Sequence, residues 1–528
     1  MRPSLETEAD AIVVGAGLNG SWVAKELASG GMKVILVDAG GILPDSTFSA
    51  RRRQVGVFDP RYHIFRLKLL LKGDTDLALS KFVNSRTARF FLDRRSDPYL
   101  TPPNRNFLWT RSRVVGGRGH FWGRVMLRVT DRQLTYPGFE WPIRYNDLAQ
   151  YYSEIEQLLE MGGASSGLNE VPDGEYVHER SLHAYEKQFS DSVTRRWPHR
   201  RLVINHIAQY DPAPFSPMLR MALGTGRLSL QTDKVVMSLV TDGPNMAVTG
   251  VTAICSKSGT KTTYRAPFVI LAASAFESVR ILLNSKCERF PNGVGNSTGL
   301  LGTRILEHIV DGVFGPLPFS MRSKNPKYSH DPFKLNAEPH GFYMPTFAHI
   351  ENNSLQYRFG YGVQGTISAA TGIYYLAGFG ETVPSDKNRL QLDRGKKDRF
   401  GIPLASIDFA WAEEDLAMWR DMKRAVAEMT DAFCRDNGAK LDNSLANRIY
   451  NMLNMDRTPL PGSNHECGGA RMGTEPASSV VDPYNRVWDA PNVLVCDGAC
   501  FPSLPCQNPT LTTMALAVRA SRKLLTEN

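Results

Sequence analysis

The sequence has no long hydrophobic run. Its longest apolar stretches, such as Val269–Ala273 and Val493–Cys496, are far shorter than the roughly 20 apolar residues that a membrane-spanning helix requires. The first residues, Met1–Glu6, become acidic before any apolar stretch begins, and this order does not match an export signal. We therefore expect no membrane span and a cytoplasmic location.

Cysteine is also scarce. The chain holds seven cysteines in 528 residues, an odd number without the dense spacing of a disulfide framework. Cys496, Cys500 and Cys506 lie close together, but no pair has the two-residue gap of a zinc knuckle and no histidine falls between them. Reduced thiols in the core explain these cysteines better than a metal site, and we expect no metal.

Nucleic-acid-binding motifs, internal repeats and low-complexity tracts are missing as well. The formal net charge is +9 and Arg51–Arg53 form a short basic run, a balance that could suit a polyanion. The positive charge is nevertheless spread along the chain, which indicates a solvated surface rather than a nucleic-acid partner.

The composition that is present suits a large globular core. Hydrophobic residues make up 42% of the chain, and 528 residues exceed one ordinary domain, so we expect two domains. Short alternating segments such as Leu390–Asp393, followed by a helical pattern over Glu413–Arg435, predict a sheet backed by helices in the second half.

A dinucleotide site is predicted at the N-terminus. The β-branched run Ala11–Val14 fits a buried strand and leads directly into the glycine-rich segment Gly15–Gly20. Gly15 allows the tight turn, Gly17 lets the backbone approach a pyrophosphate, and Gly20 lets the following helix pack on the strand. The free N–H groups and dipole of that helix favour the phosphate.

A second strand strengthens this prediction. Lys33–Val37 ends at Asp38, roughly 20 residues after the glycines, where an acid can accept the ribose hydroxyls. A carboxylate there also argues against a phosphorylated ribose, because the two anions would repel each other. An ordinary glycine turn followed by an exposed aspartate remains the alternative, and this unit alone does not identify the dinucleotide.

Several later segments, in order, resemble the glucose-methanol-choline (GMC) oxidoreductases. They are Thr110–Gly123, Trp141–Ile143, Asp147–Tyr152, Val269–Ser278, Asn296–Gly302 with His308, His465–Gly473, Asn492–Gly498 and Asn508–Thr512. The His-x-x-Gly-Gly spacing at His465 and the end Asn508–Thr512 look most similar to pyranose oxidases and bacterial glycoside oxidases.

The resemblance implies a mixed α/β fold. A Rossmann-like FAD-binding domain would be assembled from residues 1–45, 105–135, 215–310 and 460–528. A discontinuous substrate-binding domain, an antiparallel sheet backed by helices, would comprise 136–214 and 311–459. Residues 46–104, rich in arginine and aromatics, resemble no motif and could form a lid or an oligomerisation arm.

The resemblance also implies two catalytic residues, His465 and Asn508. Oxidising an alcohol with a flavin requires a base for the hydroxyl proton, and histidine, with an unperturbed pKa near ~6.5, suits that task. Asn508 would hydrogen-bond the substrate hydroxyl or the developing oxyanion. Its position before Pro509 also fits a capped helix, and both interpretations can hold together.

The expected cofactor is FAD. The N-terminus of the final helix, with the Thr510 N–H as donor, would stabilise the negative charge of the reduced flavin. Asp497–Gly498 would contact the ribityl-phosphate region, with a plain Asp-Gly turn as the alternative. The cofactor contacts that the resemblance implies, beyond Gly15, Gly17, Gly20 and Asp38, are Arg113, Gly116, Gly117, Gly119, His120, Gly123, Val235, Ala273, Asp497, Gly498, Asn508, Pro509 and Thr510.

Noncovalent binding is expected for this FAD. Some pyranose oxidases attach their flavin through a histidine, but Phe121 stands at the corresponding position here and His120 lies one residue early. Because a one-residue offset usually turns a side chain to another face, His120 could simply be a neighbouring residue outside the flavin's direct contacts.

The function expected from these residues is oxidation of a ring secondary hydroxyl, C2 or C3, of a pyranose sugar or glycoside by hydride transfer to flavin N5, with reoxidation by O2 or another acceptor. The alternative is a dehydrogenase of another alcohol or polyol that uses a quinone or protein acceptor. A nicotinamide-dependent dehydrogenase and a non-catalytic flavoprotein leave the His465 and Asn508 motifs unexplained. Specificity is expected around 323–346, where four residues fit a sugar pocket or an ordinary surface loop: Tyr328, His330, His340 and Tyr343.

Overall fold

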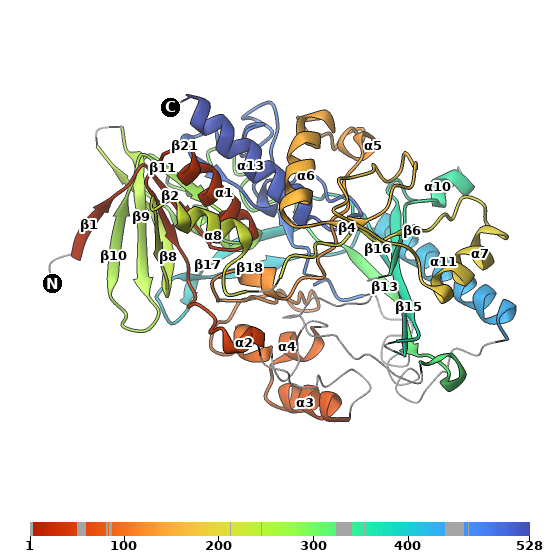
Figure 1. The fold of residues 1–528 in the computed structure, drawn as a ribbon. Coiled ribbons are helices and arrows are strands. Elements are labelled where there is room, and N and C mark those ends of the chain that lie inside the picture. The colour runs from red at the N-terminus through yellow and green to blue at the C-terminus, as the bar shows by residue number, and fades with distance from the viewer. Residues whose placement is uncertain are drawn as a thin grey trace.

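The structure is a computed structural model that describes residues 4–49, 60–80, 83, 87–211, 213–243, 245–323, 341–352, 354–370, 372–438, 459–462 and 464–527. Two sheet-based halves lie side by side, one holding both chain termini and the other holding an antiparallel sheet with its helices (Figure 1). The mixed α/β fold predicted from the sequence is confirmed.

A six-stranded sheet is the centre of the first half. Its strands, in spatial order, are β20 (Arg486–Val487), β21 (Ala490–Val495), β11 (Phe268–Leu271), β2 (Ala11–Val14), β3 (Val34–Val37) and β7 (Leu228–Gln231). All pairs are parallel except β20 with β21. The central strands are apolar throughout and buried, as a parallel sheet covered on both faces requires.

Alternate residues of each central strand serve the two faces of this sheet. Ala11 and Val13 pack in one hydrophobic cluster with helices α1 (Leu18–Ser29), α8 (Pro217–Gly224) and α13 (Thr510–Glu527). Ile12 and Val14 pack on the other side, in a cluster that includes the four-stranded sheet of β1 (Ser4–Glu8), β10 (Lys261–Arg265), β9 (Ala247–Cys255) and β8 (Lys234–Asp242).

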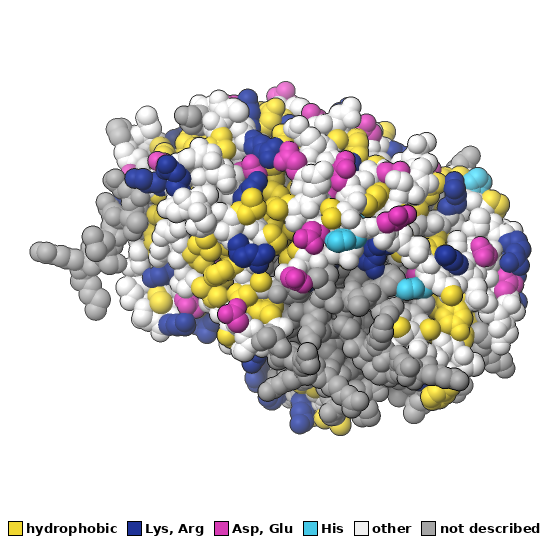
Figure 2. Space-filling model, in the orientation of Figure 1, with side chains coloured by type: hydrophobic (Ala, Val, Ile, Leu, Met, Phe, Trp, Pro, Cys, Tyr) yellow, Lys and Arg dark blue, Asp and Glu magenta, His cyan; other side chains and the backbone are white. Residues whose placement is uncertain are grey.

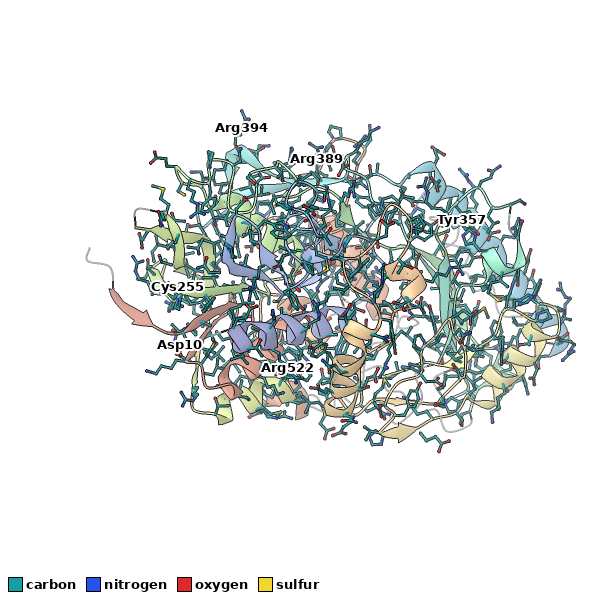
Figure 3. The ribbon with its side chains drawn as sticks, turned by 90° about the horizontal axis from the view of Figure 1, so that it is seen from above. Asp10, Cys255, Tyr357, Arg389, Arg394 and Arg522 are labelled. Atoms are coloured by element: carbon teal, nitrogen blue, oxygen red, sulfur yellow. The ribbon has the colours of Figure 1, made fainter. Side chains whose placement is uncertain are left out.

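Helix α13 joins the first half to α6 (Asn146–Leu158). Arg522 of α13 donates to Glu154 of α6 at 2.8 Å and to Glu26 of α1 at 2.9 Å. Viewed from above, Arg522 lies beside these helices, with Cys255 and Tyr357 toward opposite ends of the molecule (Figure 3).

The second half contains a five-stranded antiparallel sheet. Its order is β13 (Ile309–Pro316), β16 (Ile373–Gly380), β15 (Tyr361–Ser368), β14 (Phe342–Met344) and β6 (Val203–Ile204). Helices α11 (Glu413–Asp436) and α7 (Ala184–Thr194) cover one face, and glycines at Gly378 and Gly380 leave room for the Met422 and Met418 side chains of α11. The helical pattern predicted for Glu413–Arg435 corresponds to α11.

The described part of residues 46–104 packs against the loop that follows it. This part forms α2 (Ser46–Ser49), α3 (Pro60–Leu71), α4 (Thr75–Leu79) and the 3-10 turn η1 (Ala88–Phe90). Phe65 and Leu69 of α3 join a small apolar cluster with Phe91 and Phe121. The remaining elements are η2 (Gly117–His120), α5 (Asp131–Leu134), β4 (Gly162–Gly163), β5 (His178–Glu179), α9 (Ala275–Asn284), β12 (Ile305–Leu306), η3 (Phe319–Met321), α10 (Ala348–Glu351), β17 (Arg389–Lys397), β18 (Pro403–Asp408), β19 (Cys467–Gly468) and η4 (Gly498–Cys500).

Three expectations from the sequence concern the surface charge, membrane-spanning segments and the cysteines. On the face shown in Figure 2, basic and acidic side chains are interspersed with each other and with hydrophobic side chains. No helix in the described ranges is long and apolar enough to cross a membrane. Cys496, Cys500 and Cys506 are buried free thiols, and within the described residues no three His, Cys, Asp or Glu side chains gather as metal ligands.

Candidate active site

A cavity of about 650 Å³ is lined by residues of both halves. Its lining includes the glycine-rich turn after β2, Asp38 and Val235 of β8. His465, Asn508 and side chains of β15 and β16 also line it. Segments far apart in the sequence therefore meet at one cavity.

The three glycines after β2 have different surroundings. A Cβ on Gly15 would collide with the carbonyl of Ala272, and a Cβ on Gly20 would collide with the carbonyl of Gly15. A Cβ on Gly17 would meet nothing within 4 Å and would enter the cavity. Gly17 at the N-terminus of α1 is therefore where the backbone can approach a bound pyrophosphate.

Asp38 follows β3 at the wall of the cavity. Its two carboxylate oxygens accept hydrogen bonds from the backbone N–H groups of Ala16 at 2.7 Å and Gly40 at 2.8 Å. Burial raises the pKa of Asp38 to about 6. The carboxylate is fixed in place beside the glycine turn, and its remaining lone pairs suit ribose hydroxyls.

The loop 110–123 forms a second wall. Gly117 lies against Gly17, since a Cβ on Gly117 would be 3.7 Å from the Gly17 Cα atom. Phe121 and Trp122 line the cavity. His120 does not; its Nε2 lies 2.8 Å from the Val115 carbonyl and its ring is 5.4 Å from that of Phe48.

Most of the residues expected at the cofactor do line the cavity. They are Gly15, Gly17, Asp38, Arg113, Gly117, Gly119, Gly123, Val235, Ala273, Asp497, Gly498, Asn508, Pro509 and Thr510. Gly20, Gly116 and His120 do not line it: Gly20 packs α1 on the turn, and Gly116 leaves room for the His120 ring. The geometry therefore gives these three a supporting position instead of direct cofactor contact.

His465 stands at the cavity between two nitrogen-bearing side chains. Its Nδ1 is 2.8 Å from Nδ1 of His308, and its Nε2 is 3.3 Å from Nδ2 of Asn508. Burial, with smaller contributions from His308 and Arg118, lowers the pKa of His465 well below its usual value. A neutral imidazole facing the cavity can accept a proton from a substrate hydroxyl.

Asn508 lies just before the final helix. Helix α13 begins at Thr510, and the Asn508 side chain accepts a hydrogen bond from Gln364 Nε2 at 2.6 Å and approaches His465. These contacts give the Asn508 amide a place beside His465, and its capping of the helix stays a prediction.

Asp497 has a local structural partner as well as a place at the cavity. Its side chain accepts from the Ser278 hydroxyl at 2.5 Å and from the Ala499 N–H at 3.0 Å, which caps η4. Burial raises the pKa of Asp497 to about 6.

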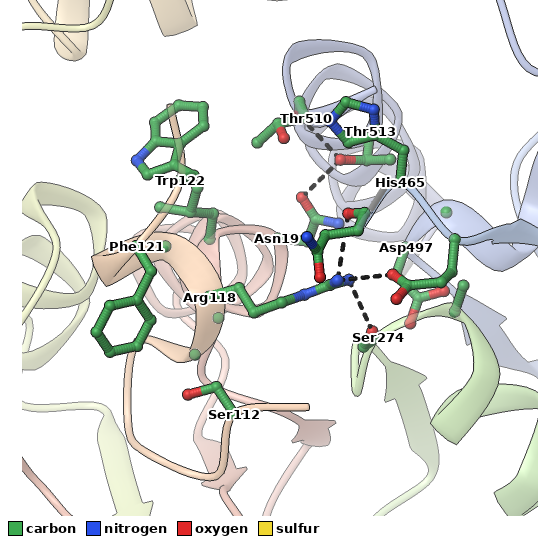
Figure 4. Close-up of a pocket in the computed structure, with 18 of the residues that line it drawn as sticks. Asn19, Ser112, Arg118, Phe121, Trp122, Ser274, His465, Asp497, Thr510 and Thr513 are labelled. Atoms are coloured by element: carbon green, nitrogen blue, oxygen red, sulfur yellow. Dashed lines mark hydrogen bonds and ion pairs between the residues drawn. The ribbon is translucent and has the colours of Figure 1, made fainter. Parts of the chain in front are cut away.

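An ion pair that sequence reasoning missed also lies at the cavity. Arg118 Nη1 is 2.6 Å from a carboxylate oxygen of Glu466, and Nη2 is 3.4 Å from the Ser274 hydroxyl. Figure 4 shows Arg118 reaching from the loop of Phe121 and Trp122 toward Ser274 and Asp497. No spacing in the sequence relates Arg118 to Glu466.

A row of polar side chains on β15 was missed too. Gln364, Thr366 and Ser368 alternate along the strand and line the cavity, together with Asn205 beside β6. Their period-2 spacing in Tyr361–Ser368 was the available signal. Tyr343, expected as a pocket residue, is buried in β14 and does not line the cavity, whereas Tyr328, His330 and His340 lie outside the described residues.

Comparison with known proteins gives a family match at the C-terminal end of the chain. Residues 384–517 match the C-terminal model of the GMC oxidoreductases, so this part of the chain is a GMC oxidoreductase C-terminal domain. The chain is similar to 2-methyl-1,2-propanediol dehydrogenase of Mycolicibacterium austroafricanum, with 25% identity over 97% of this chain and 94% of the relative. It is also similar to paromamine 6'-oxidase of Streptomyces fradiae, with 26% identity over 97% of this chain and 90% of the relative.

Other GMC relatives match over a shorter length or share the fold. A C-glycoside 3-oxidase of Arthrobacter globiformis is 29% identical over 27% of this chain and 25% of the relative. Pyridoxine 4-oxidase of Mesorbium loti superimposes with a TM-score of 0.62 at 16% identity, covering 97% of this chain and 98% of that one. A formate oxidase of Aspergillus oryzae, solved to follow FAD modification, gives 0.64 at 13% identity, covering 100% and 99%.

The enzyme class follows from these matches. The full-length and partial relatives are oxidases and dehydrogenases of alcohols and sugars, so this chain is an oxidoreductase acting on CH–OH groups. The prediction of a GMC enzyme is therefore confirmed.

Proposed function

We propose that this GMC oxidoreductase binds one FAD noncovalently and oxidises a ring secondary hydroxyl, C2 or C3, of a pyranose sugar or glycoside. The observation that carries the substrate class is the uncharged polar row on β15, which shares the cavity with His465 and Asn508.

FAD fits a second set of residues that line the cavity. The open backbone at Gly17 suits the pyrophosphate, Asp38 suits the ribose, and Pro509 and Thr510 bring the N-terminus of α13 to the wall. The bound flavin would supply a hydride acceptor. The polarity of the α13 N-terminus favours the negative charge that a reduced flavin carries.

His465 and Asn508 supply the proton chemistry in this proposal. His465 Nε2 takes the proton of the substrate hydroxyl, while the hydrogen bonded to the carbon that carries this hydroxyl leaves as hydride. Asn508 lies 3.3 Å from that nitrogen, so one substrate oxygen can reach both side chains. The amide stabilises the negative charge that develops on the oxygen.

The polar row favours a substrate with several hydroxyl groups. Thr366 is partly exposed and Ser368 is nearly buried at the cavity wall, and each carries a group that donates and accepts. The Thr366 hydroxyl donates to Glu186 at 3.1 Å, and its oxygen can still accept a hydrogen bond from a substrate hydroxyl. The relatives named for paromamine and C-glycosides support the same class.

Anaerobic mixing with candidate substrates tests the proposal. We expect pyranoses or glycosides to bleach the flavin faster than simple primary alcohols or choline. Thr366→Val and Ser368→Ala should each lower kcat/KM for the preferred sugar by about 3- to 10-fold, the worth of one neutral hydrogen bond, and leave a monohydric alcohol unaffected. Preference for simple alcohols over every sugar tested would contradict the substrate class.

In this proposal the electron acceptor is O2, a quinone or a protein carrier. Admitting air to the bleached enzyme separates these cases. Reoxidation within the turnover time supports an oxidase, and bleached flavin that only a quinone or protein carrier restores supports a dehydrogenase.

A further inference from the structure

His308 and a backbone carbonyl stand behind His465. His308 Nε2 is 2.8 Å from the carbonyl oxygen of Pro505, and His308 Nδ1 is 2.8 Å from Nδ1 of His465. The two imidazole planes are nearly perpendicular, at 89°. His308 is 1% exposed and does not line the cavity, so it reaches the reaction only through His465.

The Pro505 carbonyl determines where each proton lies. A carbonyl oxygen can only accept, so His308 Nε2 must carry a hydrogen. A neutral imidazole carries one ring hydrogen, which leaves His308 Nδ1 as an acceptor. His465 must then donate from its own Nδ1, and its Nε2 is left with a free lone pair at the cavity.

We infer that the Pro505 carbonyl and His308 act as a positioning relay that holds His465 in the tautomer with an unprotonated Nε2. This inference rests on the proposed function, because it assigns that lone pair to the substrate hydroxyl. It adds His308 as a positioning residue for the same site.

The amides on the cavity side agree with this direction. With a lone pair on His465 Nε2, Asn508 turns its NH2 group toward it, and the Asn508 oxygen then accepts from Gln364 Nε2 at 2.6 Å. One backbone carbonyl thus orients the donors along a chain of four side chains. When substrate binds, the Asn508 N–H can donate its hydrogen bond to the substrate oxygen instead of to His465.

Burial keeps both rings neutral, and nearby charge adds to this effect at His465. Burial lowers the pKa of His308 to about 4, and the pKa of His465 is also lowered. Arg118, from η2, opposes a second positive charge at His465, while its partner Glu466 offsets part of that charge. One Glu307 oxygen accepts the backbone N–H groups of His308 at 2.9 Å and His465 at 3.2 Å, which fixes the two residues together.

In the reaction, the relay determines where the proton goes. The substrate O–H bond breaks and its proton bonds to His465 Nε2, while the electron pair of that bond forms the carbonyl as the hydride leaves. The Nδ1–H of the resulting imidazolium remains hydrogen-bonded to His308, so the new charge has an acceptor ready.

Histidine labelled with nitrogen-15 tests the relay without turnover. In the FAD-loaded protein near pH 7, nitrogen chemical shifts should show His465 protonated at Nδ1 and unprotonated at Nε2, with its signals identified by their loss in His465→Asn. His465 protonated at Nε2 in the wild type would overturn the inference, whether or not any sugar is oxidised. Sugar oxidation failing while this tautomer is found would instead reject the proposed function and leave the relay standing.

The matched pair His308→Asn and His308→Leu tests its effect on rate. Asn can accept from His465 Nδ1–H and should retain most of the flavin-reduction rate, whereas Leu cannot and should lose about 10²-fold, with substrate Kd unchanged. A purely structural role predicts the reverse order, because Leu suits a buried site better than Asn. The control is His349→Leu, because His349 of α10 makes a comparable 2.9 Å contact with the Phe359 carbonyl; this variant should change neither the His465 tautomer nor the rate. Leu reducing flavin as fast as Asn would overturn the relay.

Discussion

At the scale of single residues, the site depends on a histidine that stays neutral. Burial lowers the pKa of His465 well below 6.5, and nearby His308 and Arg118 lower it further. A base works in its deprotonated form, so a lowered pKa extends its working range toward acid. The cost of this arrangement is a conjugate acid that gives its proton up readily.

This environment predicts the pH dependence of flavin reduction. The rate under anaerobic conditions should stay level as pH falls through 6.5, and the acid limb should begin well below that value. Stopped-flow traces across pH measure this rate. The pKa values of Asp38 and Asp497 are both raised to about 6, so these two carboxyl groups are titrated in the same pH range. The visible spectrum checks that FAD stays bound throughout. An acid limb centred at 6.5 or above would contradict the assigned environment.

A second residue-scale prediction concerns flavin attachment. Phe121 lines the cavity, while the His120 Nε2 is held against the Val115 carbonyl, so no histidine of this loop is placed for a covalent bond. Acid precipitation should therefore release the yellow colour into the supernatant. Colour that stays in the pellet would reject noncovalent binding, and its loss in His120→Ala would identify the attachment point.

Residue roles were predictable where a local pattern carried them. His465 and Asn508 could be named because each stands in a distinctive segment, and the structure brings their side chains together. The contact of His465 with His308 joins residues 157 positions apart, and that of Arg118 with Glu466 joins residues 348 apart. The pairing of β12 with β19 brings the segments of His308 and His465 together, and no spacing in the chain reveals such long-range contacts.

At the scale of elements, the turn between β2 and α1 contains one glycine that affects FAD binding and another that affects folding. Gly17→Ala should fold normally but bind FAD more weakly, because the added methyl group enters the cavity. Gly20→Ala should unfold or fail to accumulate, because its methyl group would collide with the Gly15 carbonyl inside the packed turn. Thermal unfolding of the FAD-free proteins, paired with FAD titration, measures both effects. Equal FAD affinity in Gly17→Ala and the wild type would contradict the pyrophosphate placement.

Strands were predictable from the sequence to different degrees. β2, β3, most of β11 and the Val493–Val495 end of β21 are buried and therefore appear as continuous apolar runs. β15 was not identified, because glycines at Gly362 and Gly365 interrupt its pattern and its polar residues face a cavity instead of solvent. The usual rule that polar positions mark the exposed face fails on a strand that lines a binding site.

At the scale of the whole molecule, a buried ion pair joins α9 to the β17–β18 ribbon. Arg280 and Asp398 are 2.8 Å apart, with side chains 7% and 4% exposed, and Arg280 also donates to the Pro403 carbonyl. Arg280→Leu should lower the free energy of unfolding by about 3–5 kcal/mol, because it leaves a buried carboxylate without its partner.

An exposed pair provides the control for this prediction. Arg358 and Glu414 are also in contact, but their side chains are 46% and 31% exposed, so Arg358→Leu should cost only about 0–1 kcal/mol. Denaturant unfolding of the two variants compares them. Similar losses would show that burial does not determine the strength of these pairs.

The central claim is that His465, assisted by Asn508, removes the substrate proton during hydride transfer to FAD, and stopped-flow measurement of anaerobic flavin reduction tests it most directly. With a sugar or glycoside that bleaches the wild type, His465→Ala should slow reduction by about 10²- to 10⁴-fold while the protein remains folded and yellow. Asn508→Ala should cost roughly 10²-fold, and the double variant less than the product of the two losses, because both act on one proton and one oxygen. Reduction of His465→Ala at the wild-type rate would contradict the account.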